Sequence, residues 1–277
     1  MRVIKMFKNS NNYKKGQNGN KSHSRIGEIG KKSLLGVGFS DANKEQILEF
    51  IIRGLGKNDK KFYVVTPNPE ILVIANKDPY YKKVLNNAKI ASVDGVGVLI
   101  AGKILGVKFG ERLPGVELLE TLCEGVAKQP ITVGFLGAGP RVAERAAECL
   151  REKYPDLKII FTHDGRADDE TVRYINDKML QESTKKTIDL LFVAFGSPRQ
   201  ELWIAKNINK LPIKVAIGIG GGLDFISGKV KRAPKLFQTL GLEWFWRLLI
   251  QPWRIKRQLS LVTFLYLVLK EKLSSSK

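Results

Sequence analysis

The chain is poor in the residues that build disulfide frameworks and metal clusters. Its 277 residues include only two cysteines and two histidines, and Cys123 and Cys149 each fall inside a predicted helix. So few cysteines exclude a disulfide-stapled fold, and because no signal-peptide layout precedes the first domain we expect a reducing cytoplasm. The longest apolar run, "LSLVTFLYLVL" at 259–269, is about half of what spans a bilayer. We therefore expect a protein that can touch a membrane without crossing it.

Acidic residues are scarce at both ends of the chain. Residues 1–32 carry a net charge of +8 and residues 229–277 carry +9, which leaves only +3 of the total +20 for the body between them. A basic groove in the body would favour nucleic acid, whereas basic ends on a nearly neutral body favour an anionic surface. No RRM, KH or helix-turn-helix signature is present either. We expect anionic lipid headgroups as a partner, and no nucleic acid.

Continuous apolar runs alternate with helical patterns of 10 to 15 residues over 33–228. Runs such as "FYVVT", "ITVGFLGAG" and "IDLLFVAFGS" are typical of parallel strands that are buried on both faces. We predict an α/β fold with a doubly wound, mostly parallel, Rossmann-like sheet, whose ligands bind outside the carboxyl ends of the strands. Residues 1–32 have no hydrophobic period, which predicts a disordered basic tail.

Residues 229–277 have no strand pattern and hold three of the four tryptophans, with Arg and Lys interleaved among Trp, Leu and Phe. This composition predicts a helical appendage that is broken at Pro252. It is typical of an element that lies on a membrane surface. An amphipathic appendage that simply packs on its own domain is the alternative.

Polar residues follow the first two strands of the predicted sheet. In "YVVTPNPEILVIA", Asn68 with Pro69 has the pattern of a helix cap, and that leaves Thr66 unexplained. Asp94 in "ASVDGVGV" is a candidate general base because glycines beside it permit close approach, and a capping Asp is the alternative. Arg112 in "GERLPGVE" is either an anion clamp or a surface arginine.

Three further stretches suggest ligand contacts. "LGAGP" supplies Gly137 and Gly139 as candidate nucleotide contacts, although Val142 replaces the third glycine of a dinucleotide fingerprint. A Rossmann-type NAD-dependent oxidoreductase is therefore the alternative function. "AFGSPRQELW" places Gln200 in a first helical turn, where an amide can bind sugar hydroxyls. "GIGGGLDFISG" is a glycine-rich loop whose N–H groups suit an anion.

The acidic pair Asp168 and Asp169 lies at a predicted helix start, where first-turn acids are favoured over metal ligands. Asp164, which ends the strand before them, is a candidate partner for a ribose hydroxyl.

Seven blocks in order resemble the WecG/TagA/CpsF family of bacterial glycosyltransferases from about Leu34 onward: TPNPE, VDG, ER-x-PG, LGAGP, FGSPRQE, GGGLDFISGKVKRAP, and GLEW followed by spaced arginines. The resemblance implies an inverting transfer, without a metal or other cofactor, of N-acetylmannosamine or a related sugar. The donor would be a UDP-sugar and the acceptor a polyprenyl-diphosphate-linked GlcNAc, in teichoic-acid linkage-unit or similar cell-surface polymer synthesis. It places the enzyme at the inner face of the bacterial membrane.

The resemblance also implies roles for residues of this sequence. Asp94 would be the base that deprotonates the acceptor hydroxyl, and Arg112 would assist at the diphosphate. Thr66, Asn68 and Gln200 would line the sugar pocket.

The appendage would supply the remaining binding groups, with Arg247, Arg254 and Arg257 folding over the active site to hold the leaving diphosphate. Such permanently charged forks can replace a divalent ion. Val93 and Glu117 depart from residues that are frequent in the family, which leaves the sugar identity open. A homo-oligomer is possible.

Overall fold

A computed structural model describes residues 29–56, 60–182, 186–239, 241–252 and 255–275, the side chains of 256–258 and 275 excepted. Most of the predicted tail, residues 1–28, lies outside these ranges. The first strand, β1 (Lys31–Leu34), begins two residues inside the predicted tail. It pairs with β2 (Val37–Ser40) in an antiparallel hairpin that the sequence analysis did not predict. Leu35 and Gly36 at its tip both have positive φ, as the tight two-residue turn requires.

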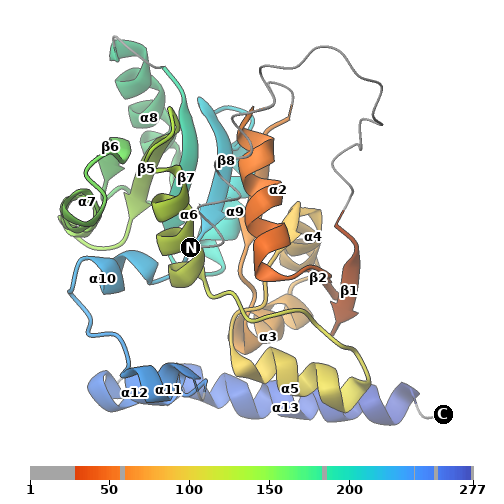
Figure 1. Ribbon diagram of the computed structural model, residues 1–277. Helices are drawn as coiled ribbons and strands as arrows, with labels where there is room; N and C mark the ends of the chain where they lie inside the picture. The colour runs from red at the N-terminus through yellow and green to blue at the C-terminus, as the bar shows by residue number, and fades with distance from the viewer. Residues whose placement is uncertain (1–28, 57–59, 183–185, 240, 253–254, 276–277) are drawn as a thin grey trace, which may run out of the picture.

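The centre of the molecule is a six-stranded sheet in which every neighbouring pair of strands is parallel. Its middle strands are buried along their whole length, as the continuous apolar runs predict. The predicted α/β fold is confirmed (Figure 1). In spatial order the strands are β4 (Ile90–Ala91), β3 (Phe62–Val65), β8 (Ile213–Gly218), β7 (Ile188–Ala194), β5 (Thr132–Gly137) and β6 (Lys158–His163).

Helices cover both faces of this sheet and bury two apolar clusters against it. Residues of one cluster come from α3 (Pro69–Lys77), α4 (Pro79–Asn87), α5 (Val96–Leu105), α8 (Asp169–Gln181) and α9 (Arg199–Asn207). Residues of the other come from α2 (Lys44–Gly56), α6 (Gly115–Val126), α7 (Val142–Lys153) and α10 (Gly222–Ile226).

The predicted helix starts agree with the structure where capping chemistry marks them. Asn68 caps α3 by accepting a hydrogen bond of 3.0 Å from the N–H of Ile71. Asp168 caps α8 in the same way, accepting from the N–H of Thr171 at 2.9 Å. The sequence analysis favoured first-turn acids at 168 and 169; Asp169 is in the first turn, and Asp168 is the cap just before it.

The appendage consists of α11 (Lys235–Thr239), α12 (Glu243–Ile250) and the long helix α13 (Ile255–Ser275). In Figure 1, α13 runs along α5 and α3, with α11 and α12 at one of its ends. Phe264 and Val268 of α13 are buried in one of the two core clusters of the α/β domain. Among the described residues, no helix is both long and apolar enough to cross a membrane.

Candidate active site

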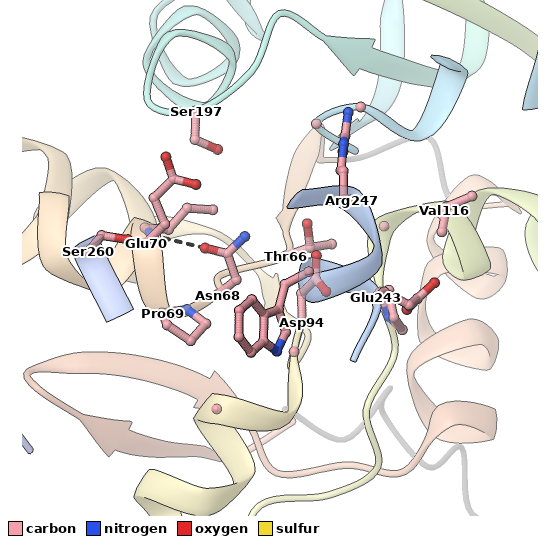
Figure 2. Close-up of a pocket in the computed structure, with 18 of the residues that line it drawn as sticks. Thr66, Asn68, Pro69, Glu70, Asp94, Val116, Ser197, Glu243, Arg247 and Ser260 are labelled. Atoms are coloured by element: carbon pink, nitrogen blue, oxygen red, sulfur yellow. Dashed lines mark hydrogen bonds between the residues drawn. The ribbon is translucent and has the colours of Figure 1, made fainter. Parts of the chain in front are cut away.

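A cavity of about 690 Å³ lies where five of the six parallel strands end, which is where a fold of this class binds its ligands. The loops after β3, β4, β5, β7 and β8 contribute to it, and α12 and α13 of the appendage close it. Figure 2 shows Thr66, Asn68 and Asp94 from the core, with Glu243 and Arg247 of the appendage beside them.

Thr66 and Asn68 both line the cavity. Thr66 directly follows β3 and is buried, and its hydroxyl donates to the carbonyl of Gly218 at the end of β8, 3.3 Å away. Asn68 uses its Oδ1 to cap α3. Capping and cavity lining are therefore compatible, because the cap engages only one of the two polar atoms of the amide.

Asp94 follows β4 and does not cap the next helix. The cap position of α5 belongs to Gly95, which has a positive φ and makes no side-chain hydrogen bond. Asp94 is partly buried and lines the cavity. Burial raises its pKa from 3.8 to about 7; the Arg112 charge and the N–H of Gly115 lower it, and the Glu243 charge raises it. A carboxylate with this pKa suits a general base at neutral pH.

Asp94→Asn is expected to change how stability depends on pH. The folded-state pKa of about 7 lies above the ordinary 3.8, so the stabilisation that Asp94 provides below pH 4 is lost as the pH rises through 7. Between pH 5 and pH 8 the wild type should lose roughly 2–3 kcal/mol relative to the variant, at 1.36 kcal/mol per pH unit. Urea unfolding at the two pH values measures this difference. Asp41→Asn, which removes an exposed carboxylate paired with Lys32, is the control, and equal curves for wild type and Asp94→Asn would contradict the prediction.

Arg112 faces Asp94 and binds the appendage. Its Nη1 donates to Oε2 of Glu243 at 3.1 Å, and its Nη2 donates to the carbonyl of Gln238 at 3.0 Å. Its own backbone forms a parallel bridge with Val93, next to Asp94. Arg112 is therefore a built part of the cavity wall and not a surface arginine.

Arg247 lies one helical turn after Glu243 and reaches the glycine-rich loop that follows β8. Its guanidinium carbon is 4.9 Å from the ring centre of Phe225, and Nη2 is 3.9 Å from Oδ2 of Asp224. A Cβ on Gly221 would come within 2.9 Å of Nη2, so a side chain at position 221 would displace the guanidinium. A guanidinium beside a glycine-rich loop is suited to binding an anion.

The comparison with known proteins decides the family. Residues 32–277 match the family described as "Glycosyl transferase WecG/TagA/CpsF family". The chain belongs to this family. The resemblance drawn from the seven sequence blocks is thereby confirmed.

Its relatives in the WecG/TagA/CpsF family include enzymes named N-acetylglucosaminyldiphosphoundecaprenol N-acetyl-beta-D-mannosaminyltransferase. The one from Bacillus spizizenii is 36% identical over 219 residues, which cover 79% of this chain and 83% of that protein. The one from Staphylococcus aureus strain MRSA252 is 34% identical over 245 residues, covering 87% and 93%. The one from Bacillus subtilis strain 168 is 34% identical over 209 residues, covering 76% and 79%.

Gln200 lines the cavity, but its side-chain amide joins two loops. Its Oε1 accepts from the N–H groups of Gly196, at 3.2 Å, and Gly220, at 3.1 Å, and its Nε2 donates to Glu201 at 2.7 Å. Glu201 is buried and also accepts from the hydroxyl of Tyr81 at 3.0 Å. Gln200 therefore shapes this part of the cavity by holding the loops after β7 and β8 together.

The remaining predicted site residues do not all meet at the cavity. Ala138 lines it, while its neighbours Gly137 and Gly139 do not. Gly137 has a φ of +96°, and a Cβ there would lie 2.7 Å from the ring of Phe195. The backbone conformation and the close packing therefore both require glycine at this position. Asp164 follows β6, the one strand of the sheet whose end lies away from the cavity.

The two arginines after α12 cannot be placed. Arg254 lies outside the described residues, and for Arg257 the structure describes the backbone of α13 only. Within the described part of the chain, no group of three His, Cys, Asp or Glu side chains could hold a metal ion.

Sequence reasoning missed Glu243 and the cavity wall from α13, which includes Ser260 and Phe264. Glu243 could have been found from its spacing, because it precedes Arg247 by four residues and so shares its helix face. The α13 wall has no such signal, since an apolar stretch does not reveal what it packs against.

Proposed function

We propose that this chain transfers N-acetylmannosamine, or a closely related sugar, from a UDP-sugar to a GlcNAc-diphospho-polyprenol lipid, with inversion at the anomeric carbon. The product would serve a teichoic-acid linkage unit or a similar cell-surface polymer. The observation that carries the proposal is the meeting of Asp94, Arg112 and Arg247 in one cavity at the strand ends. The names of the relatives supply the acceptor class.

In the proposed reaction, Asp94 accepts the proton of a hydroxyl on the acceptor GlcNAc. The oxygen then forms a bond to the anomeric carbon of the donor sugar from the face opposite UDP, and the bond from that carbon to the diphosphate oxygen breaks. UDP leaves with the bonding electron pair. A single displacement of this kind inverts the anomeric configuration, and a base near pKa 7 is suited to it at neutral pH.

Negative charge develops on the diphosphate as UDP leaves, and the proposal assigns its stabilisation to cationic side chains. Arg247 lies against Gly221 of the glycine-rich loop, so its guanidinium is on the side of the cavity that this loop lines. Arg112 interacts with Asp94 and is held by its contact to Glu243. Preorganised donors of this kind stabilise developing charge without a metal ion.

The direct test is to incubate the purified protein with a GlcNAc-diphospholipid and a panel of UDP-sugars in the presence of EDTA. The expected result is one disaccharide-lipid product, formed with UDP-N-acetylmannosamine or a close relative and with inverted anomeric configuration by NMR. Failure with every UDP-sugar, with and without Mg²⁺, would overturn the proposal.

We propose that the appendage lies on the anionic inner face of the cell membrane, where the lipid acceptor is held. Exposed apolar side chains of α13 recur at helical spacing along one stripe: Leu259, Val262, Tyr266, Leu269 and Leu273. Basic residues of the same 229–277 segment give it a charge of +9. An apolar stripe with surrounding cations is suited to an interfacial helix.

Replacing Val262, Tyr266 and Leu269 together by Ser is expected to lower partition onto vesicles of 30% anionic lipid by about tenfold or more, because the buried apolar area is lost. Cosedimentation measures it. Turnover of a long-chain lipid acceptor should fall, and turnover of a water-soluble short-chain acceptor should not. Tyr80→Ser with Leu180→Ser, which removes equally exposed apolar groups elsewhere, is the matched control. Wild-type partition of the triple variant would show that α13 is not the membrane contact.

A further inference from the structure

Glu243 is the first residue of α12, and it is where the appendage is bound to the catalytic core by charge. Its Oε2 accepts from Nη1 of Arg112 at 3.1 Å, and its Oε1 lies 3.4 Å from Nε of Arg232. Arg232 in turn donates to Oε2 of Glu120, on α6, at 3.1 Å. One carboxylate thus joins the start of α12 to two arginines, each of which is held by a second partner.

The ion pairs of Glu243 are partly shielded from solvent. The side chains of Glu243 and Arg112 are 23% and 21% exposed, and that of Arg232 is 28% exposed. Ion pairs on an open surface contribute little, whereas partly desolvated pairs in a network hold a defined geometry more strongly. Arg112 also donates to the carbonyl of Gln238, just before α12. Both terminal nitrogens of its guanidinium, Nη1 and Nη2, therefore bind the segment at the start of α12.

Glu243 and Arg247 are four residues apart on one helix, so they lie on the same face of α12. Fixing the first turn of α12 on Arg112 therefore determines where Arg247 falls along the glycine-rich loop. Nη1 and Nη2 of Arg247 lie within about 3 Å of where a Gly221 Cβ would be, so the guanidinium packs directly against this loop. A displacement of about 1 Å of such a group is costly for catalysis.

We propose that Glu243 is a positioning residue, which docks α12 on Arg112 and Arg232 and so holds Arg247 at the diphosphate end of the cavity while setting the charge around Asp94. This inference rests on the proposed function. It assigns to Glu243 no contact with substrate.

The pKa of Asp94 provides a test of this inference, because a purely structural role of Glu243 would leave that pKa unchanged. Asp94 is faced by Arg112 and by the carboxylate of Glu243, which act on its pKa in opposite directions. The other charged side chains that line the same cavity are Glu70, Arg199, Asp224 and Arg247. Removing the charge of Glu243 leaves Arg112 without its counter-charge, so the pKa of Asp94 should fall.

The experiment compares wild type with Glu243→Gln, Glu243→Asp and Glu120→Gln over pH 5 to 9. In Glu243→Gln the acidic limb of kcat/KM is expected to move down by about half a pH unit or more. In Glu243→Asp, which keeps the charge, the limb should stay near its wild-type pH and the rate should be partly restored. Glu120→Gln removes the carboxylate that holds Arg232 and leaves the pair between Glu243 and Arg112 in place. The acidic limb of this variant should therefore also stay near its wild-type pH. A limb that does not move in Glu243→Gln overturns the inference.

A double-mutant cycle tests the link to Arg247. If Glu243 acts by placing Arg247, the loss caused by Arg247→Ala should shrink from about 100-fold in the wild type to under about tenfold in Glu243→Gln, because the arginine is already displaced. Losses that simply multiply overturn the inference.

Hydrogen–deuterium exchange separates this inference from the proposed function, because it requires no turnover. Amides of 243–250 and of the glycine-rich loop 219–222 should exchange faster in Glu243→Gln than in wild type, with the central strands unchanged. Glu49→Gln, which removes a carboxylate paired with Arg53 on α2, should exchange as wild type. If the wild type transfers no sugar, the proposed function fails, and unchanged exchange in Glu243→Gln would overturn the placement of α12 independently.

Discussion

Asp94→Asn is expected to lower the rate of sugar transfer by about a thousandfold or more while leaving the protein folded. A positioned base typically contributes about 10²–10⁴-fold, and Asn has the same shape but cannot accept the proton. The measurement is kcat/KM with UDP-N-acetylmannosamine and the GlcNAc-lipid, together with circular dichroism. Asp164→Asn is the matched control, since Asp164 also follows a strand but lies outside the cavity; it should keep near wild-type activity.

The wild-type pH profile is part of the same expectation. Because the pKa of Asp94 is about 7, kcat/KM should fall about tenfold for each pH unit below that value, as the base is progressively protonated. The limb should be absent from whatever residual rate Asp94→Asn retains. Near wild-type turnover of this variant, or an unchanged acidic limb in it, would remove Asp94 from the mechanism.

Arg247→Ala is expected to lower kcat by about 10²–10³-fold, the usual cost of removing one preorganised donor to a developing charge. The loss should fall on kcat more than on KM, because the charge on the diphosphate is greatest in the transition state. Arg247→Lys should recover little, since an ammonium lacks the planar fork that fits against Gly221 and a phosphate oxygen pair.

Two controls test whether the effect of Arg247→Ala is specific. Arg53→Ala removes an exposed arginine paired with Glu49 on α2 and should leave the rate unchanged. Partition of Arg247→Ala onto anionic vesicles should stay near the wild-type value, because the apolar stripe of α13 is intact. If turnover instead required a divalent ion and were indifferent to Arg247→Ala, the assignment of the diphosphate to this arginine would be wrong.

Much of the candidate site was readable in the sequence, because its residues follow strands that local patterns reveal. Thr66, Asn68 and Asp94 each come directly after a predicted strand, and the carboxyl ends of parallel strands meet at one edge of the sheet. That rule alone predicts that these side chains share a cavity, and they do. Their roles in binding and transfer remain predictions.

Other features were not readable because local signals describe a residue's backbone but not its distant neighbours. The turn glycines Gly137 and Gly139 matched a nucleotide pattern, yet Ala138 between them is the residue that faces the cavity. Gln200 has the chemistry to bind a sugar, but two loop N–H groups engage its oxygen in the structure. The hairpin β1–β2 was missed because β1, with the sequence KKSL, has no continuous apolar run and begins inside the predicted tail.

The sequence by itself determined the α/β class, the alternation of strands and helices along the parallel sheet, the cap at Asn68, and the family, because these depend on local periodicity, capping chemistry and motif order. Only the tertiary structure decided that α13 packs on α3 and α5 to wall the cavity, and that Glu243 and Arg112 join the appendage to the core. Those contacts bring together residues 131 positions apart. Their partners are selected by packing and charge in three dimensions, which no local pattern along the chain encodes.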